Sequence, residues 1–196
     1  MLVDELKEIK VILGSQSPRR KELLASLDIE FEVIIKSVDE SIPENLGPSN
    51  AAEYIALKKL QSFDVLEFNN ALVITADTVV VDNENNVLGK PNSEEEAIRV
   101  LKSLSGKSHQ VFTGVAIRSG EQVISFTEVT RVYFSTLSDD EIQYYVDKYK
   151  PYDKAGAYGI QEWIGRVAVS RIEGSYENVM GLPTVKLYKT IKEMIK

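Results

Sequence analysis

The sequence predicts an α/β fold, with a mixed β-sheet and flanking helices in a single domain covering residues 1–196. Three observations support this prediction. Short apolar, β-branched runs alternate along the chain with segments whose apolar residues recur at helical spacing. Several helical segments open on a serine or asparagine that suits a helix N-cap. No repeat, low-complexity tract or long Pro/Gly/Ser linker interrupts the 196 residues, a length sufficient for one packed core.

The expected strands are short apolar segments bounded by polar or glycine-containing turns. The segment 73–81 is apolar and β-branched except around Asp77, and the segments on either side of Ser119-Gly120 form a pair. The expected strands are residues 11–13, 31–35, 73–81, 111–117, 123–134 and 167–172.

The expected helices follow sequence signals for helix starts. Ser17 suits an N-cap and Pro18 suits the first helical position. A second helix is expected from near Asn50, with Glu53 three residues later as in a capping box. The glycine-punctuated segment 155–165 predicts a loop. The remaining helices are expected from Ser93, from Ser138 and over residues 182–195.

Composition excludes several classes of function. Hydrophobic residues make up 43% of the chain and charged residues 27%, as in soluble globular proteins. The absence of cysteine excludes disulfides and thiol chemistry, and the single histidine, His109, excludes a multi-histidine metal site. The net charge of −7 argues against nonspecific nucleic-acid binding. Without a membrane-spanning apolar run or a signal peptide, the sequence predicts a cytoplasmic protein that binds no membrane.

The first candidate site is the segment 15–21, between a strand and a helix N-terminus. Free N–H groups and the helix dipole favour an anion at such a position. Arg19 and Arg20 can add bidentate contacts to phosphate oxygens. The alternative is an exposed, basic first helical turn. The segment lacks the glycine-rich Lys-Ser/Thr phosphate loop of nucleoside triphosphatases.

The second candidate is Asp77, inside a strand that otherwise suits burial. A buried carboxylate is costly without a partner, and a metal, a lysine or a catalytic water would each supply one. The alternative is an aspartate at a strand end that faces solvent or caps a turn.

Three further features are weaker by themselves. If the strands on either side of residues 82–86 pair as a hairpin, Lys90 could return toward Asp77; the alternative is an ordinary surface lysine. Asp39 and Glu40 could ligate Mg²⁺ with another carboxylate, or be solvated loop acids. Gln161 follows three small residues and could pair with a base edge, or lie in a flexible surface loop.

Taken together, these segments resemble the Maf family of nucleotide pyrophosphatases. The similarity runs from Leu13 to about Tyr188, and its motifs occur in the family's order. They include Ser-x-Ser-Pro-Arg-Arg at 15–20, Asp-Glu at 39–40, Ala-Asp-Thr-Val-Val at 76–80, Leu-Gly-Lys-Pro at 88–91, Thr-Gly at 113–114 and Asp-Lys-Ala-Gly-Ala-Tyr-Gly-Ile-Gln at 153–161. The chain departs from the family pattern at Asp28 and at Glu162-Trp163, where glycine is usual.

The resemblance implies an elongated fold with an active-site cleft between two lobes, a homodimer, and pyrophosphate release with a divalent metal, Mg²⁺ or Mn²⁺. Asp77 would be the proton acceptor and, with Glu40, would hold the metal. The residues expected to contact substrate are Ser15, Arg19, Arg20, Lys59, Thr78, Lys90 and Gln161. The form of the 155–161 segment resembles the branch that acts on dTTP and UTP.

The resemblance therefore implies hydrolysis of a nucleoside triphosphate to the monophosphate and pyrophosphate, in a house-cleaning role for the nucleotide pool. Gln161 would read the O4/N3–H edge that uracil and thymine share. Two alternatives stay open from the sequence. The enzyme could act on other nucleotides, such as 7-methyl-GTP, ITP or XTP, or the chain could regulate septum formation by binding a partner.

Overall fold

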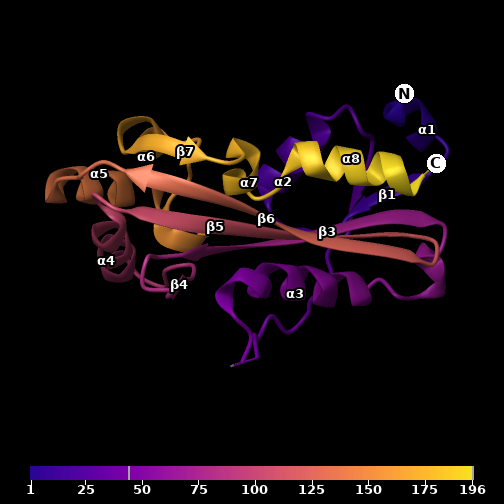
Figure 1. Ribbon diagram of the computed structural model, residues 1–196, viewed down its shortest axis with the longest axis horizontal. Coiled ribbons are helices and arrows are strands. Elements are labelled where there is room, and N and C mark those ends of the chain that lie inside the picture. The colour runs from indigo at the N-terminus through magenta and orange to yellow at the C-terminus, as the bar shows by residue number, and fades with distance from the viewer. Residues whose placement is uncertain (44, 196) are drawn as a thin grey trace. The chain divides into compact units, whose positions relative to one another are not determined.

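The computed structural model describes residues 1–43 and 45–195, which form an α/β structure around a mixed seven-stranded sheet (Figure 1). This confirms the predicted fold class. The strands are β1 (Lys10–Leu13), β2 (Glu32–Val33), β3 (Ala71–Val81), β4 (Val87–Leu88), β5 (Ser108–Ser119), β6 (Gln122–Phe134) and β7 (Val169–Glu173). The helices are α1 (Leu2–Leu6), α2 (Pro18–Ala25), α3 (Pro48–Gln61), α4 (Glu94–Leu104), α5 (Asp139–Tyr149), α6 (Trp163–Val167), α7 (Tyr176–Met180) and α8 (Thr184–Met194), with 3₁₀ turns η1 (Leu66–Phe68) and η2 (Ala155–Ala157).

The sheet has the strand order β2-β1-β3-β5-β6-β7, with β4 beside β3. β1 is parallel to β2 and β3, whereas β4 is antiparallel to β3 and β7 to β6. In the β1–β3 register Leu13 lies opposite Ile74, and the Gly14 N–H donates to the Ile74 carbonyl at 2.8 Å. The turn after β1 therefore begins beside the part of β3 that leads to Asp77.

The chain divides into two compact units, and the long strands β3, β5 and β6 contribute residues to both. Unit 1 comprises Met1–Asp77, Thr113–Glu128 and Gly181–Lys196, and unit 2 comprises Thr78–Phe112 and Val129–Met180. In unit 1, α3 and α8 lie on opposite faces of the sheet (Figure 1). In unit 2, α4 packs against α5.

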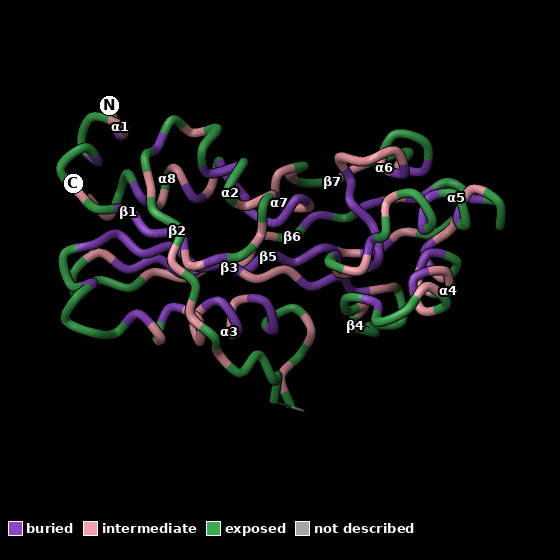
Figure 2. Tube along the Cα trace, turned by 180° about the vertical axis from the view of Figure 1, so that it is seen from behind, coloured by how far each residue is buried: buried purple, intermediate pink, exposed green. Residues whose placement is uncertain are grey.

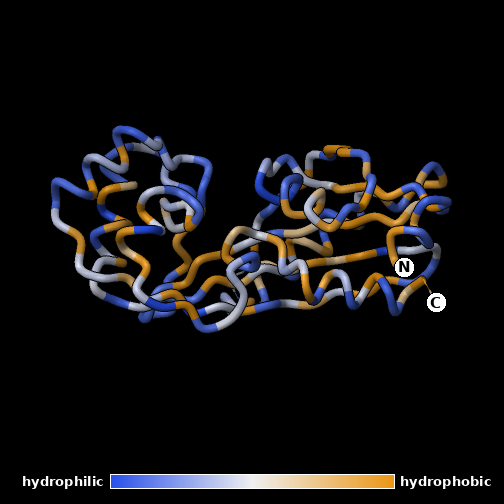
Figure 3. Tube along the Cα trace, turned by 90° about the horizontal axis from the view of Figure 1, so that it is seen from above, coloured by the Kyte–Doolittle hydropathy of each residue, from blue (hydrophilic) through white to orange (hydrophobic). Residues whose placement is uncertain are grey.

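The cores of both units are built from strand residues and one face of each helix. In Figure 2 the strands β1, β3 and β5 are mostly buried, whereas β2, β4, β6 and β7 are mainly half-buried or exposed. Figure 3 shows long hydrophobic stretches, in orange, along extended segments of the chain. In unit 1, Phe63 after α3 packs with Ile12 and Val73 of the sheet. In unit 2, Leu101 of α4 and Tyr145 of α5 are fully buried.

Local start signals predicted three helix N-termini correctly. The Ser17 hydroxyl caps α2 by accepting the Arg20 N–H, with Pro18 as the first helical residue. Ser93 caps α4 in the same way through the Glu96 N–H. Ser138 forms a complete capping box with Glu141 at the start of α5.

Other sequence-based boundaries were wrong. The strand expected over 31–35 is reduced to Glu32–Val33, and both residues are exposed. The helix expected near Asn50 begins at Pro48 after Gly47, which has no side chain to cap it. Glu53 does not act in a capping box, because its carboxylate accepts hydroxyl hydrogen bonds from Ser125 and Thr127 at 2.6 and 2.7 Å.

The segment 155–165 is also more ordered than the predicted loop. It contains η2 and the start of α6, a five-residue helix that extends to Val167. The next strand, β7, therefore starts at Val169 rather than at residue 167. A helix this short has too few apolar positions to show helical periodicity, and Gly165 within it is an unfavourable helix former.

His109 is fully buried at the start of β5, where Nε2 lies 2.7 Å from the Tyr158 hydroxyl and the ring packs edge-to-face on Phe134. Burial lowers the pKa of His109 from 6.5 to about 4. The unfolded chain thus binds a proton at this histidine below pH 6.5, which the folded chain does not bind until about pH 4. Stability falls as the pH falls through this window.

We therefore expect the free energy of unfolding to drop by roughly 3 kcal/mol between pH 7 and pH 4 through His109 alone. Urea unfolding at a series of pH values measures this dependence. The His109→Phe variant should lose it between pH 6.5 and 4.5, whatever its own stability at pH 7. The same pH dependence in both proteins would contradict the assignment to His109.

Within residues 1–43 and 45–195, no helix is both long enough and apolar enough to cross a lipid bilayer.

Candidate active site

The turn between β1 and α2 is held by two serines and an arginine. Ser15 is buried, and its hydroxyl oxygen accepts hydrogen bonds from the Ser17 N–H at 3.2 Å and from Arg20 Nη1 at 3.3 Å. Arg20 Nε donates to the Gly181 carbonyl at 2.8 Å. These contacts fix the guanidinium at the helix N-terminus, where the backbone favours an anion.

A second group of charged residues meets at Asp77 in the middle of β3. Lys59, near the end of α3, places its Nζ 2.7 Å from Asp77 Oδ1 and 2.9 Å from Glu40 Oε1. The side chains of Lys59 and Asp77 are only 16% and 15% exposed. Of the three partners that the sequence allowed for the Asp77 carboxylate, a metal, a lysine or a water, the structure shows the lysine.

The neighbouring lysine and acid form a separate pair. Lys58 Nζ lies 3.0 Å from Asp39 Oδ2, and Asp39 also accepts hydrogen bonds from the N–H and hydroxyl of Ser41. These bonds to Ser41 and Lys58 hold the pKa of Asp39 well below its usual value. Of the two adjacent lysines, Lys59 is the one that contacts Asp77, and of the two adjacent acids, Glu40 is the one that shares its ammonium.

Electrostatics link the two groups of residues. Partial removal from water lowers the pKa of Arg20, while the negative charges of Asp77 and Glu40 raise it and the positive charge of Arg19 lowers it. Arg20 therefore lies within the field of both carboxylates and of its neighbouring arginine. We call Ser15, Arg20, Glu40, Lys59 and Asp77 the charged cluster, and all five belong to unit 1.

The charged cluster fits a divalent cation in part. Glu40 and Asp77 both approach one point, the Lys59 ammonium, to within 2.9 Å. Carboxylate oxygens are ligands that Mg²⁺ and Mn²⁺ prefer, and Mg²⁺ is commonly held by one or two carboxylates with substrate phosphates and water. Among the described residues no three acidic or histidine side chains gather at one point. The residues present therefore suit a cation that takes its other ligands from a phosphate substrate and water.

The other predicted substrate residues, Thr78, Lys90 and Gln161, lie in unit 2. Lys90 is exposed just after the β3–β4 hairpin, in which Val80 pairs with Leu88. The carbonyl of Gly89, next to Lys90, accepts the Gly156 N–H at 3.2 Å. The hairpin and the segment that leads to Gln161 are thus joined within unit 2.

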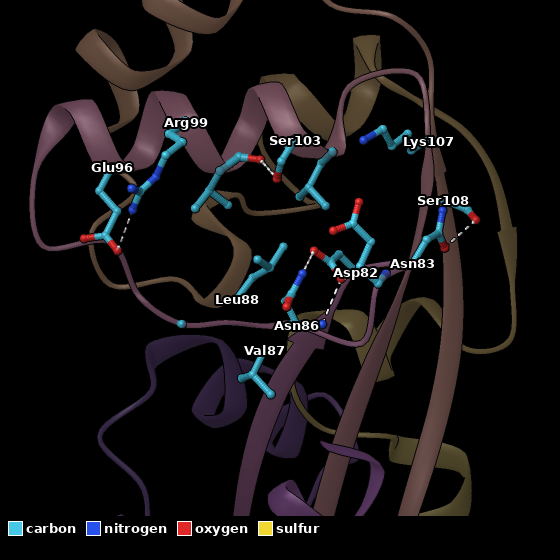
Figure 4. A pocket seen from close by; sticks show the side chains of 14 residues that line it. Asp82, Asn83, Asn86, Val87, Leu88, Glu96, Arg99, Ser103, Lys107 and Ser108 are labelled. Carbon is cyan, nitrogen blue, oxygen red and sulfur yellow. Dashed lines mark hydrogen bonds and ion pairs between the residues drawn. The ribbon is translucent and has the colours of Figure 1, made fainter. Parts of the chain in front are cut away.

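A hollow of about 490 Å³ also lies in unit 2, between the β3–β4 hairpin and α4 (Figure 4). Its lining includes three carboxylates and two cationic side chains, and none of the predicted site residues. Asp82 is engaged by Asn86, and Glu96 pairs with Arg99. An anionic substrate is therefore disfavoured in this hollow relative to the helix N-terminus at Arg20.

Sequence reasoning missed two kinds of residue around these positions. Gly181 contributes a backbone carbonyl, and no side-chain pattern could reveal that contact with Arg20. The second kind comprises Tyr145 and Lys154, which no sequence pattern above assigned to the site. The structure buries both and connects them to Glu162 beside Gln161. The position of Lys154 directly before the glycine-containing segment 155–165 was the one signal for this network in the sequence.

The fold and the charged cluster define an α/β protein with a basic helix N-terminus beside a strand aspartate, an arrangement suited to phosphate chemistry. Comparison with known proteins identifies the family to which this chain belongs. A family model described as Maf-like protein matches residues 10–194. The chain belongs to the Maf family.

Relatives cover essentially the whole chain. The dTTP/UTP pyrophosphatase of Porphyromonas gingivalis is 48% identical over 195 residues, which are 98% of each chain. The dTTP/UTP pyrophosphatase of Flavobacterium johnsoniae is 43% identical and covers 100% of both chains. Among solved structures, the Staphylococcus aureus Ham1 protein aligns with 95% of this chain and 100% of its own, with a TM-score of 0.52 and 16% identity. This last similarity shows a shared fold alone.

Proposed function

We propose that the protein hydrolyses dTTP and UTP to the nucleoside monophosphate and pyrophosphate. The observation that carries the proposal is the charged cluster, in which Asp77 is held by Lys59 in the field of Arg20. Support for the substrates comes from relatives named dTTP/UTP pyrophosphatase that match over nearly their whole length. House-cleaning of the nucleotide pool is the role that this activity would serve.

In the proposed reaction, water attacks the α-phosphorus, the bond from that phosphorus to the bridging oxygen breaks, and pyrophosphate leaves. Asp77 accepts the proton of the attacking water. Lys59 orients that carboxylate, since its ammonium contacts Asp77 and Glu40 together. Arg19 and Arg20 hold the triphosphate at the N-terminus of α2, next to Ser15. No protein nucleophile is required, which agrees with a chain that contains no cysteine.

Glu40 and Asp77 are the residues that would hold Mg²⁺ or Mn²⁺. A bound divalent cation would neutralise phosphate charge and lower the pKa of a bound water. Lys59 and Lys90 are proposed to stabilise the departing pyrophosphate by their positive charge.

Gln161 is proposed to select the base, with Thr78 as a further substrate contact. A glutamine amide offers a donor and an acceptor side by side, which match O4 and N3–H of uracil and thymine. In support, Gln161 Oε1 is buried and accepts no hydrogen bond from the described residues. A buried acceptor without a donor costs free energy, so a rotation of the amide that brings this oxygen to a ligand donor would be favourable.

The experiment that tests the function is pyrophosphate release from a panel of nucleoside triphosphates with Mg²⁺ or Mn²⁺. We expect release from dTTP and UTP to exceed that from ITP, XTP and 7-methyl-GTP. Preference for one of those three would reject the pyrimidine assignment and keep the reaction. No release from any nucleotide would reject the reaction itself and favour a binding role such as septum regulation.

Removal of divalent cations is expected to abolish pyrophosphate release. A chelator withdraws the cation from Glu40 and Asp77, which leaves the charge of the triphosphate without its main counterion. Addition of Mg²⁺ or Mn²⁺ in excess of the chelator should restore the rate. The melting temperature without substrate serves as a control for loss of folding. Undiminished activity in the chelator would contradict the metal assignment.

Two further properties are proposals from the family resemblance, a homodimeric state and a cytoplasmic location. Light scattering coupled to size exclusion distinguishes a mass of 22.0 kDa from twice that value.

A further inference from the structure

The turn that carries Gln161 is fastened at both ends to one tyrosine hydroxyl. The Glu162 N–H donates to the Gly159 carbonyl at 3.0 Å, which closes the turn 159–162. The Gly159 N–H donates to the Tyr145 hydroxyl oxygen at 3.0 Å, and the Tyr145 hydroxyl donates to Glu162 Oε2. Gln161 lies between the two residues that Tyr145 binds.

A buried lysine completes this arrangement. Lys154 Nζ lies 3.1 Å from Glu162 Oε1 and 2.7 Å from Asp153 Oδ1. The side chains of Lys154 and Glu162 are only 9% and 19% exposed. Burial raises the pKa of Tyr145, so its hydroxyl keeps its proton and remains a donor to Glu162. Breaking the ion pair between Lys154 and Glu162 would leave a charge with little solvation, so the positions of these two side chains are costly to change.

Two glycines allow the turn to be packed from both sides. A Cβ on Gly159 would lie 2.8 Å from Glu162 Cδ and 3.1 Å from Lys154 Cε. A Cβ on Gly165 would lie 1.8 Å from the Ile160 carbonyl oxygen. The carboxylate thus covers one part of the turn, and the backbone of α6 lies directly against another.

Donor and acceptor matching alone cannot give the base selectivity proposed for Gln161. Guanine and hypoxanthine present O6 and N1–H side by side, the same pattern as O4 and N3–H of thymine, on a larger ring system. A glutamine free to move could pair with either edge. Discrimination between them requires that the amide be held in one place.

We propose that Tyr145, Lys154 and Glu162, here named the Tyr145 clamp, are positioning residues that fix Gln161 and so set the base selectivity. The proposal rests on the proposed function, in which Gln161 contacts the base. The three side chains act through the turn 159–162, and they do not themselves contact substrate. The ligand that the positioned Gln161 would select is a pyrimidine base with a carbonyl beside a ring N–H.

The decisive variant is Tyr145→Phe, which removes the one hydroxyl and keeps the ring that stacks on Tyr149. We expect the ratio of kcat/KM for dTTP to that for dGTP to fall about tenfold. KM for dTTP should account for most of the change, with kcat altered less than about threefold, because the charged cluster is untouched. A general loss of folding would lower kcat for both nucleotides and leave their ratio unchanged.

One control, a second clamp variant and a double variant separate positioning from stability. Tyr144→Phe makes the same change at the preceding residue, where the hydroxyl contacts only Lys148 among the described hydrogen bonds, and should leave the ratio unchanged. Glu162→Gln keeps an acceptor for Tyr145 but loses its charge beside Lys154, and should lower the ratio less than Tyr145→Phe does. In a Gln161→Ala background, Tyr145→Phe should produce no further change in the ratio.

A folded Tyr145→Phe protein whose dTTP/dGTP ratio stays within about twofold of the wild-type ratio would overturn the clamp. So would an additional change in the Gln161→Ala background. If Tyr145→Phe does not fold, an unchanged ratio in Glu162→Gln overturns the proposal instead. Failure of the proposed function is distinct, because the wild-type protein would then release no pyrophosphate from any nucleotide, and both proposals would fall together.

Discussion

Replacement of Asp77 by asparagine is expected to lower kcat/KM for dTTP by roughly 10³-fold, within the usual range for a proton acceptor and its charge. The change keeps the size of the side chain, and the amide oxygen can still accept from Lys59 Nζ. Lys59 also keeps its ion pair with Glu40 at 2.9 Å. Circular dichroism and thermal melting should therefore stay close to those of the wild-type protein, while pyrophosphate release falls by that factor.

The matched control for this variant is Asp28→Asn. Asp28 is an exposed aspartate with a φ of 57°, a conformation that asparagine also adopts readily. A positive φ of this kind favours glycine, and aspartate is among the residues that tolerate it. Asp28→Asn should retain full activity. Activity of Asp77→Asn within tenfold of that control would show that Asp77 is not the proton acceptor.

Local chemistry explains which parts of the fold could be predicted. A helix start depends on contacts three residues apart, so Ser17, Ser93 and Ser138 were identified as caps from the sequence alone. Glu53 was wrongly placed in a capping box because tertiary contacts prevailed. Its carboxylate binds two hydroxyls of β6 that lie more than seventy positions along the chain. Such partners leave no local signal.

In the candidate site, too, local patterns could be predicted from the sequence and tertiary contacts could not. Asp77 could be singled out because a carboxylate in an apolar strand violates the usual pattern of burial. Its partner could not be chosen locally, since Lys58 and Lys59 are adjacent and chemically identical. The rotation of α3 decides between them, because it directs Lys59 to Asp77 and Lys58 to Asp39. That rotation is set by how α3 packs on the sheet.

Gly114 in β5 lies directly against the backbone of α3, and Gly114→Ala is expected to lower the free energy of unfolding by about 3 kcal/mol or more. A Cβ at this position would lie 2.2 Å from the Glu53 nitrogen and 2.3 Å from the Ala52 carbonyl carbon. Both are backbone atoms of α3, so no side chain can move aside to make room. The strand and the helix must separate instead. Urea unfolding monitored by circular dichroism measures the loss.

Gly89→Ala is the matched control, because a Cβ at Gly89 meets no atom within 4 Å. The free energy of unfolding of Gly89→Ala should stay within about 0.5 kcal/mol of the wild-type value. A loss below about 1 kcal/mol in Gly114→Ala would contradict the close packing of β5 on α3. The folded fraction of Gly114→Ala should also show reduced pyrophosphate release. A shift of α3 carries Lys59 with it, and the 2.7 Å contact with Asp77 tolerates a displacement of only a few tenths of an ångström. The Thr-Gly motif would then act on catalysis through the position of a helix, without contact between Gly114 and the substrate.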